Sequence, residues 1–587
     1  MSSLKTTHRW AVAQQNPELE KELSAGLGIP GLVARIMVAH GIGSIKEGQL
    51  FLTPSLDRDW ADPLIIPGMS VVADRVERAI RNHEHIAVFG DFDVDGITST
   101  CLLTEALRTF GADVTPFIPH RFDEGYGLSR AALDRVNELA RPQLIVTVDN
   151  GIAAKEEVSY LESLGIELVV TDHHEPSDQV PQGVPLTDPK LEDEGPSREL
   201  AGAGVALKLV QVLGERLGKP SYWRSLIEVA ALGTVSDMMP LTPENRALVA
   251  EGIQQMRVTA RPGYIALAAL AKADLSSITA DGLSFSLIPR LNAAGRMAVD
   301  REEDMSAPSG GHAAVNLLVE RNEDLADEFG IFIDSSNQAR KSIDRSVTQE
   351  AHDYIRSHPE YAMMKSTVIY NPKWMKGIVG IVASRLIETY YRPTVVLTMS
   401  NGFVTGSARS VPGFDLYQAV ESCADLLENF GGHMYAAGLT MKPENIEAFM
   451  HRFNEYVEQN IDPNMLIPQV EIDSELLFSD ITPSFRATLE AFQPFGPGNT
   501  APVFVTRGVS NRGDAKLVGA EKEHLRMDLT QKQKPNTTIA AIAFQQPAYL
   551  EWIRSGRPVD VCYTVVENHY RGKTTPQLRI KDIKIVR

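Results

Sequence analysis

Short apolar runs that stop abruptly at acidic residues or imidazoles constrain the fold of this chain more than any other feature. Three such runs occur within about 90 residues, and each has the length of a buried strand. Open α/β folds place their sites where the carboxyl ends of parallel strands meet. We therefore expect the residues at the three run ends to share one site. The runs and the residues that end them are Ile86–Phe89 with Asp91, Asp93 and Asp95; Leu144–Val148 with Asp149; and Ile166–Thr171 with Asp172, His173 and His174.

The spacing of these runs predicts a doubly wound α/β domain. From about residue 84 to about residue 240, strand-like runs alternate with helical stretches such as 98–110 and 129–140. Alternation at these lengths is typical of a mostly parallel sheet with helices on both faces.

The pattern changes further along the chain. A polar segment up to about residue 357 has the intermittent apolar positions of long bridging helices, and a smaller α/β pattern follows. Short β-like runs separated by turn residues then predict a small barrel. The expected parts are a helical N-terminal segment at 1–83, the α/β domain with a helical extension at 84–300, a helical connector at 301–357, a smaller α/β domain at 358–465 and a barrel at 466–587.

The composition is ordinary for a globular protein, with 43% hydrophobic and 23% charged residues. No window approaches the roughly 18 to 20 apolar residues of a membrane span, and the first residues lack an apolar signal core. The three cysteines, Cys101, Cys423 and Cys562, are too few and too widely spaced for a zinc cluster or a disulfide framework. We expect a cytoplasmic protein with buried thiols and no membrane association.

Charge is distributed unevenly along the chain. The net charge of −19 argues against nonspecific coating of duplex DNA, because phosphate affinity comes mainly from Lys and Arg. From Ala501 onward, however, 15 Lys and Arg stand against 8 Asp and Glu. A polyanion partner and ordinary solvated surface charge are both compatible with this basic end.

Carboxylates and imidazoles without thiolates favour a magnesium or manganese site over structural zinc. Asp93 and Asp95 point to the same side of an extended turn, because side chains alternate. Asp237 follows another apolar stretch and is a fourth candidate. An isolated strand-end Asp is more often a helix cap, and a lone His more often a surface residue, but their conjunction favours metal. Asp93, Asp95, Asp149, His173 and Asp237 carry enough charge for two ions, with Asp149 as the expected bridge.

These residues resemble the motifs of the DHH phosphoesterases, a family named for the triplet found here at Asp172-His173-His174. The chain most resembles the bacterial RecJ family of single-strand-specific exonucleases, from about residue 50 onward. The matching motifs are Gly90–Gly96, Val148–Ile152, Thr171–His174 and Gly233–Asp237. The resemblance implies that the five residues above bind metal, that His174 faces the scissile phosphate, and that Asp172 supports them.

The resemblance also implies substrate contacts elsewhere. Arg121, in the segment 119–127, is expected near a 5′ phosphate, and Ser407, Arg409 and His433 are expected to bind nucleotide in the second α/β domain. Arg290 and Arg296 suit a phosphate clamp by chemistry, and the sequence does not choose between them. The segments 495–499 and 524–526 resemble the linker and a strand of an oligonucleotide-binding barrel, which would account for the basic C-terminal end.

Two positions depart from the family pattern without touching the predicted metal ligands. Met375 stands where histidine is expected, and Ala408 stands where glycine is usual. These departures leave the fold prediction intact. They concern the substrate contacts of the second α/β domain.

The sequence and the resemblance together predict a metal-dependent 5′ to 3′ exonuclease on single-stranded DNA that acts in repair and recombination. Two Mn²⁺ or Mg²⁺ ions are the expected cofactors. A single-strand-binding protein and a helicase are the expected partners, and a monomer is the expected state. The alternatives are a phosphodiesterase of the same superfamily acting on short oligoribonucleotides or cyclic dinucleotides, and a non-catalytic replication scaffold with the same fold.

Overall fold

The computed structural model describes residues 8–120, 124, 127–296, 310–531, 534–570 and 573–586. The chain forms two compact units. The parallel-sheet unit contains residues 53–341 and 493–500, and the barrel unit contains residues 1–52, 342–492 and 501–587. Because compactness separates only two units, the five-part division of the chain stays a prediction.

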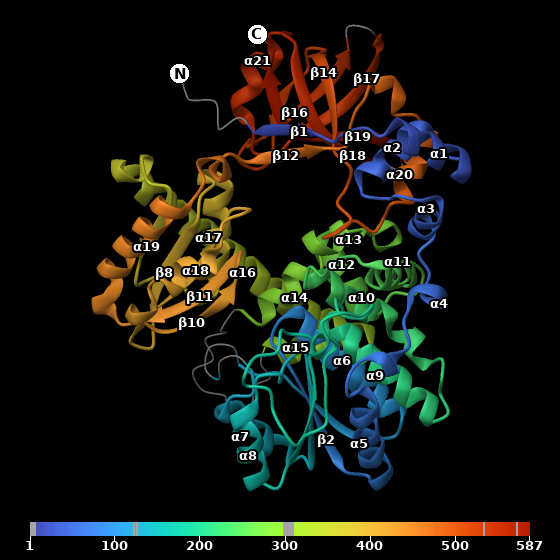
Figure 1. Cartoon of the computed structure of the whole chain (residues 1–587), viewed down its shortest axis with the longest axis vertical. Helices are drawn as coiled ribbons and strands as arrows, with labels where there is room; N and C mark the ends of the chain where they lie inside the picture. The colour runs from blue at the N-terminus through green and yellow to red at the C-terminus, as the bar shows by residue number, and fades with distance from the viewer. Residues whose placement is uncertain are drawn as a thin grey trace. The chain divides into compact units, whose positions relative to one another are not determined.

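The sheet of the parallel-sheet unit has five strands, all parallel, in the order β3-β2-β4-β5-β6 (Figure 1). The direction of winding reverses between β2 and β4, and such switch points are where open α/β sheets bind ligands. The predicted parallel sheet is therefore confirmed. The strands are β2 (His85–Gly90), β3 (Asp113–Phe117), β4 (Leu144–Val148), β5 (Glu167–Thr171) and β6 (Leu186–Thr187).

Helices cover both faces of this sheet, because successive side chains of a buried strand point to opposite faces. Ile86 and Val88 of β2 belong to one hydrophobic cluster, and Ala87 and Phe89 belong to another. In Figure 1, α7 and α8 lie on one side of β2 and α5 and α9 on the other. These helices, with the central α6, are α5 (Met69–Asn82), α6 (Val94–Thr109), α7 (Arg130–Ala140), α8 (Lys155–Ser163) and α9 (Gly202–Arg216).

A helical extension completes this unit and leads into the predicted long helix, α16, whose 35 residues cross the boundary between the units. Gly310 and Gly311 begin α15, although adjacent glycines are typical of loops. Side chains there would collide with the carbonyl group of Ala294 and with Ile118, so these glycines serve close packing. The helices are α10 (Ile227–Ser236), α11 (Pro243–Val258), α12 (Pro262–Ala271), α13 (Ala280–Phe285), α14 (Ile288–Ala294), α15 (Gly310–Val319) and α16 (Glu323–Ser357).

The barrel unit contains the predicted second α/β domain, built on a mixed sheet of order β10-β11-β9-β8-β7. The stretch 414–429 is not one helix, because the helix α18 ends at Glu421 and the strand β10 starts at Leu427. The elements are β7 (Thr367–Tyr370), α17 (Lys376–Tyr390), β8 (Thr394–Ser400), β9 (Phe403–Arg409), α18 (Leu416–Glu421), β10 (Leu427–His433), β11 (Ala436–Met441) and α19 (Ile446–Asn460).

The predicted C-terminal barrel is also confirmed. Five strands close in the order β14-β18-β19-β17-β16, since β16 also pairs with β14. The barrel strands are β14 (Phe504–Asn511), β16 (His524–Gln531), β17 (Lys534–Ala543), β18 (Val559–Tyr570) and β19 (Lys573–Ile585). The short strands β13 (Ser474–Glu475) and β15 (Lys516–Val518) lie at the two ends of the sheet order. Two helices connect strands of this sheet: α20 (Pro483–Glu490) lies between β13 and β14 in the sequence, and α21 (Leu550–Arg554) lies between β17 and β18.

The N-terminal segment is not purely helical. Its strand β1 (Arg9–Val12) pairs in parallel with β12 (Gln469–Ile472), so residues from opposite ends of the chain form one small sheet. The helices α1 (Pro17–Leu27), α2 (Gly31–Ala39) and α3 (Ile45–Leu52) follow, and α4 (Leu56–Asp59) lies in the other unit. In the part of the chain described, no single helix is long and apolar enough to cross a membrane; α1 and α2 reach that length and composition only together, bent by 119°.

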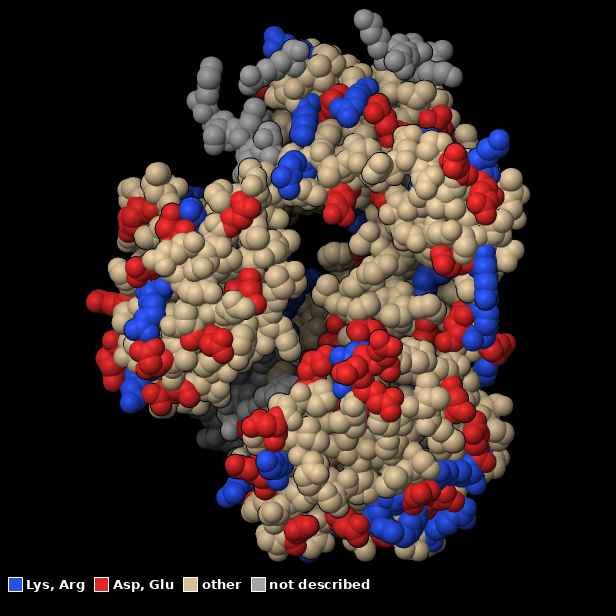
Figure 2. Space-filling model, in the orientation of Figure 1, with Lys and Arg blue, Asp and Glu red and all other residues tan. Residues whose placement is uncertain are grey.

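The surface carries charges of both signs. On the face drawn in Figure 2, Lys and Arg side chains are interspersed with Asp and Glu on both units. Among the residues coloured there, the basic surplus after Ala501 does not gather into one continuous patch on this face. The three cysteines are free thiols and buried, as predicted.

Candidate metal centre

The loop after β2 brings three carboxylates to the switch point of the sheet. Asp93 caps α6, and its Oδ1 accepts the N–H groups of Asp95 at 2.9 Å and of Gly96 at 3.1 Å. Asp91 and Asp95 are buried. A side chain at Gly96 would collide with the main chain of Asp91, so the tight loop requires glycine there.

The first turn of α9 holds Asp95 in place. The N–H group of Gly202 donates to Asp95 Oδ2 at 2.7 Å, and that of Ala203 donates to Oδ1 at 3.0 Å. A β-carbon on Gly202 would stand 2.6 Å from that of Asp149, and one on Gly233 would stand 2.6 Å from Asp95 Oδ1. The two glycines therefore let α9 and α10 approach the carboxylates. Burial, and then the charges of Asp237 and Asp93, raise the pKa of Asp95 well above its usual value, against these two hydrogen bonds.

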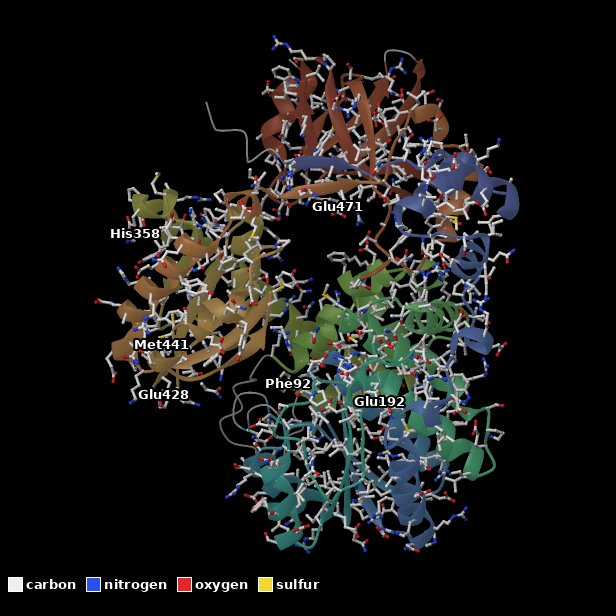
Figure 3. The ribbon with its side chains drawn as sticks, viewed as in Figure 1. Phe92, Glu192, His358, Glu428, Met441 and Glu471 are labelled. Carbon is white, nitrogen blue, oxygen red and sulfur yellow. The ribbon has the colours of Figure 1, made fainter. Side chains whose placement is uncertain are left out.

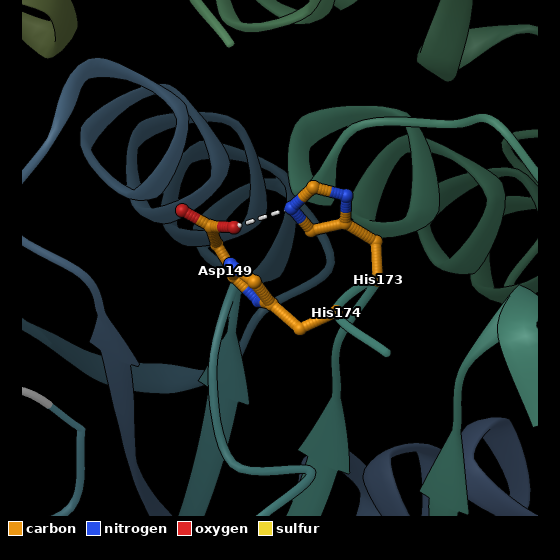
Figure 4. Close-up of side chains that lie close together, drawn as sticks. All are labelled: Asp149, His173 and His174. Carbon is orange, nitrogen blue, oxygen red and sulfur yellow. Dashed lines mark ion pairs between the residues drawn. The ribbon is translucent and has the colours of Figure 1, made fainter. Parts of the chain in front are cut away.

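Asp149 follows β4 with a left-handed backbone, φ 60°. This conformation is uncommon for residues other than glycine and is concentrated at functional sites. The side chain is buried, and its Oδ1 lies 3.0 Å from His173 Nε2 (Figure 4). Burial, and then the charges of Asp95 and Asp93, raise the pKa of Asp149 well above its usual value.

His173 lies at the centre of the carboxylates. Besides its contact with Asp149, its Nε2 lies 3.7 Å from Asp95 Oδ2 and 3.7 Å from Asp237 Oδ2. Burial, and then the charge of His174, lower the pKa of His173 to about 3. The ring is therefore neutral at physiological pH, which is the form that binds metal ions.

Asp237 approaches from the C-terminus of α10, where it is the capping residue. Its side chain is 31% exposed, so it borders the open side of the cluster. Burial, and then the charge of Asp93, raise the pKa of Asp237 to about 7.

The ligand atoms of these residues fit divalent ions. They form three overlapping groups, and within each group the atoms lie within 4.8 Å of one another. Asp149 Oδ1 and His173 Nε2 are buried and make no hydrogen bond, and the raised carboxylate pKa values reflect charge that the protein leaves uncompensated. Oxygen and imidazole ligands suit Mn²⁺ and Mg²⁺. The groups are Asp95, His173 and Asp237; Asp91, Asp93 and Asp149; and Asp149, His173 and His174.

His174, a member of the third of these groups, is also paired with Asp172. Nδ1 of His174 lies 2.7 Å from Asp172 Oδ1, while Asp172 Oδ2 accepts the N–H group of Ile152 at 2.9 Å. Burial lowers the pKa of His174, but the hydrogen bond and the charge of Asp172 outweigh it and raise the pKa to about 9. His174 is therefore a partly exposed cation at neutral pH.

The structure brings together all five residues predicted as ligands and adds Asp91, which the prediction left out. Asp91 is the first acid of the same motif, so its sequence position was an available signal. Asp188 also follows a strand, β6, and burial followed by the charge of Asp172 raises its pKa to about 7, but it belongs to none of the three ligand groups. Gly202 donates a hydrogen bond to Asp95 and allows α9 to approach Asp149, and no sequence pattern predicted either contact.

The predicted phosphate-binding arginines of this unit differ in their surroundings. Arg121 lies outside the described residues. Arg290 is buried, and its guanidinium group pairs with Asp334 at 2.8 Å and donates to the carbonyl group of Ser286 at 2.7 Å. Arg290 therefore ties helices together. Arg296 is only partly buried and follows Gly295, where a side chain would collide with the carbonyl group of Phe92, labelled in Figure 3.

The other predicted substrate residues lie together on the sheet of the second α/β domain. Ala436 of β11 pairs with Arg409 of β9 on one side and with His433 of β10 on the other. Residues in such a row share a face, and strands two apart are separated by about 10 Å. Ser407 shares this face because it is two residues before Arg409. Burial lowers the pKa of Arg409.

Three family models match the chain. They describe the DHH family N-terminal domain over residues 85–234, the DHHA1 domain over residues 363–459 and the RecJ OB domain over residues 472–582. The fold prediction is thereby confirmed in each of its three domain types.

Full-length relatives agree with these matches. The chain is 34% identical to the single-stranded-DNA-specific exonuclease RecJ of Bacillus subtilis, covering 98% of this chain and 71% of that protein. It is 32% identical to the Escherichia coli protein of the same name, covering 96% of this chain and 98% of that protein. The crystal structure of RecJ in complex with Mn²⁺ from Thermus thermophilus matches with a TM-score of 0.80 at 28% identity, over 99% of this chain and 80% of that chain. Its Mg²⁺ complex matches with a TM-score of 0.76 at 26% identity, over 99% of this chain and 79% of that chain. The chain belongs to the RecJ family of DHH-domain exonucleases.

Proposed function

We propose that the protein is a metal-dependent exonuclease that removes nucleotides from the 5′ end of single-stranded DNA. The observation that carries this proposal is the cluster of carboxylates around His173 at the switch point of the sheet. Similarity to RecJ proteins named for specificity toward single-stranded DNA supports the choice of substrate. The alternative activities on short oligoribonucleotides or cyclic dinucleotides have no comparable support.

Two ions would be held by residues of this cluster. Asp95, His173 and Asp237 form one ligand group, and Asp91, Asp93 and Asp149 form a second. Asp149 is the proposed bridge, since it belongs to the second group and lies 3.0 Å from His173 of the first. Bound Mn²⁺ or Mg²⁺ supplies activation of a water molecule and neutralisation of charge on the phosphate.

The protein's own residues orient and stabilise the substrate. His174 is cationic and partly exposed, so its ring can donate a hydrogen bond to a phosphate oxygen. Asp172 holds that ring in place through Nδ1. Arg290 is not proposed as the clamp, because its guanidinium group is engaged within the protein, and Arg296 stays the proposed residue.

Polarity would come from recognition of the terminal phosphate, for which Arg121 is the proposed contact. Ser407, Arg409 and His433 of the second α/β domain are the residues proposed to bind nucleotide. The basic barrel would bind the strand beyond the cut, through backbone contacts and stacking. A cytoplasmic monomer that works in repair and recombination with a single-strand-binding protein and a helicase is the setting we propose.

An assay with end-labelled strands tests this function. DNA and RNA strands labelled at the 5′ or the 3′ end are incubated with the protein and Mn²⁺, next to dinucleotide substrates. Release of mononucleotides from the 5′ end of single-stranded DNA is expected, and Asp149→Ala should abolish it with any metal. Activity on dinucleotides alone would favour the superfamily alternative, and no hydrolysis at all would favour a non-catalytic scaffold.

A further inference from the structure

The segment Gln493–Thr500 belongs to the parallel-sheet unit, although the residues before and after it belong to the barrel unit. It contains the sequence predicted to be the linker to the barrel, and the proposed mechanism gives it no part. The segment contacts Leu241, which lies shortly after the predicted metal ligand Asp237 in the sequence.

The segment has a fixed shape of its own. The N–H group of Asn499 donates to the carbonyl group of Gly496 at 3.1 Å, and that of Gly496 donates back at 3.0 Å. Pro497 and Gly498, with φ 76° at the glycine, complete the pattern of a type II turn. The buried Asn499 side chain also donates to the carbonyl group of Pro494 at 2.7 Å. Hydrogen bonds within the segment therefore hold the turn in this shape.

This turn is docked on Leu241. The N–H group of Leu241 donates to the carbonyl group of Pro497 at 2.7 Å. A β-carbon on Gly496 would stand 3.0 Å from Leu241 Cδ1, so the turn packs closely on that side chain. Nearby, the buried Arg246 donates to the carbonyl group of Gln493 at 3.2 Å. Leu241 itself belongs to the main hydrophobic cluster of the unit.

Leu241 lies only four residues after Asp237, and the chain between them is strained. The N–H group of Met239 donates to Thr234 and that of Met238 to Val235, both at 3.3 Å, which is the Schellman pattern of helix ends. Met238 occupies its left-handed position with φ 56°, where glycine is usual. Its side chain is 70% exposed, so burial of this side chain does not hold the strained conformation.

We propose that the turn Gly496–Asn499 positions Asp237 for metal binding. By anchoring Leu241 it fixes the exit of the helix cap on which Asp237 lies. Without the anchor, the strained cap can relax and carry the Asp237 carboxylate away from His173, from which it is now 3.7 Å. The inference rests on the proposed function, because it takes Asp237 as a metal ligand. The residues of the turn are positioning residues and touch neither metal nor substrate.

The test measures Mn²⁺ binding by calorimetry on the full chain, independently of nuclease activity. Gly496→Val places a branched side chain against Leu241. Asn499→Ala removes the side-chain hydrogen bond to the carbonyl group of Pro494 without adding volume. Gly195→Val is the matched control, since Gly195 is exposed and has open space at its β-carbon. Lost orientation of a ligand typically costs 10- to 100-fold in metal affinity, so both variants should weaken Mn²⁺ binding about tenfold. They should lower kcat while KM for single-stranded DNA stays within about twofold, whereas the control should match the wild type.

A purely structural role for the turn would give a different result. Folded Gly496→Val and Asn499→Ala proteins with wild-type Mn²⁺ affinity and only a lowered Tm would overturn the proposal. Asp237→Ala is measured alongside them. If it weakens Mn²⁺ binding and the turn variants do not, the positioning role fails and the ligand assignment stands. If Asp237→Ala itself binds Mn²⁺ like the wild type, the assignment and the positioning role fail together.

Discussion

Replacing Gly202 with alanine should disable the metal centre while leaving the fold intact. A β-carbon on Gly202 would stand 2.6 Å from the Asp149 β-carbon and 2.9 Å from its α-carbon. Ordinary van der Waals contact begins at 3.4 Å, so Asp149 or the first turn of α9 must shift by about 0.8 Å. Rotation of the Asp149 side chain cannot relieve this clash, because neither of these two atoms moves with it.

Either shift misplaces a predicted ligand. If α9 moves, Asp95 loses its 2.7 Å hydrogen bond from Gly202, and if Asp149 moves, the proposed bridge moves with it. A misplacement of about 1 Å costs about 100-fold in rate, and lost ligand orientation costs at least about tenfold in metal affinity. Overpacking costs about 1–3 kcal/mol of stability. Gly202→Ala should therefore lose kcat and Mn²⁺ affinity and still fold.

The assay is single-turnover hydrolysis of a 5′-labelled single strand, combined with Mn²⁺ calorimetry and thermal unfolding. Gly204→Ala on the same helix is the control. The nearest atoms to its β-carbon would be Leu200 Cδ2 at 3.0 Å and Leu200 Cβ at 3.2 Å, so a shift of a few tenths of an ångström relieves the contact, and no predicted ligand is among these atoms. A folded Gly202→Ala protein with the kcat and Mn²⁺ affinity of Gly204→Ala would refute the reasoning.

Three further predictions follow from the described contacts. His174→Gln should lower kcat about 100-fold and leave the Kd for Mn²⁺ within about twofold in calorimetry, because His174 is proposed to contact phosphate. Arg290→Ala should lower the unfolding free energy by about 1–3 kcal/mol in chemical denaturation, since it leaves the partly buried Asp334 carboxylate without this partner, whereas Arg296→Ala should raise KM for single-stranded DNA with little change in Tm. Burial lowers the pKa of His312 to about 3, below the 6.5 expected when unfolded, and its Nε2 accepts the Ile118 N–H group at 3.4 Å. The contribution of neutral His312 to the unfolding free energy is therefore fully present above pH 6.5 and should fall as the pH drops toward 3, by up to about 1.4 kcal/mol per pH unit. If the unfolding free energy of the wild type falls no more steeply with pH than that of His312→Gln, this prediction is wrong.

The sequence predicted the strands and the acids at their ends because both follow from local chemistry. A buried parallel strand must be an apolar run, and the carboxyl ends of such strands meet at one edge of the sheet. Asp93, Asp149 and His173 could therefore be placed at one site from their positions after these runs. The match of each run to an observed strand confirms that step.

Features that depend on distant contacts were not predictable in this way. The hydrogen bond from Gly202 to Asp95 joins residues 107 positions apart, and the sequence around Gly202 contains no pattern that predicts it. The sequence made Arg290 a candidate phosphate ligand, because its actual partner, Asp334 in α16, lies 44 residues away and could not be recognised from a local pattern. The strand β1 pairs with a strand about 460 residues later, so a local pattern could not reveal the pairing.

The triplet Asp172-His173-His174 divides its work through opposed electrostatics. The rings of His173 and His174 are 4.5 Å apart, yet their pKa values are about 3 and about 9. Burial drives His173 to the neutral form, while the hydrogen bond that His174 donates to Asp172 keeps His174 protonated. Neighbouring titratable groups whose environments push their pKa values apart can take opposite chemical roles. A neutral imidazole is suited to a metal ion and a cationic one to a phosphate, so burial prepares His173 for the proposed metal role, and Asp172 prepares His174 for the proposed phosphate role without itself contacting either.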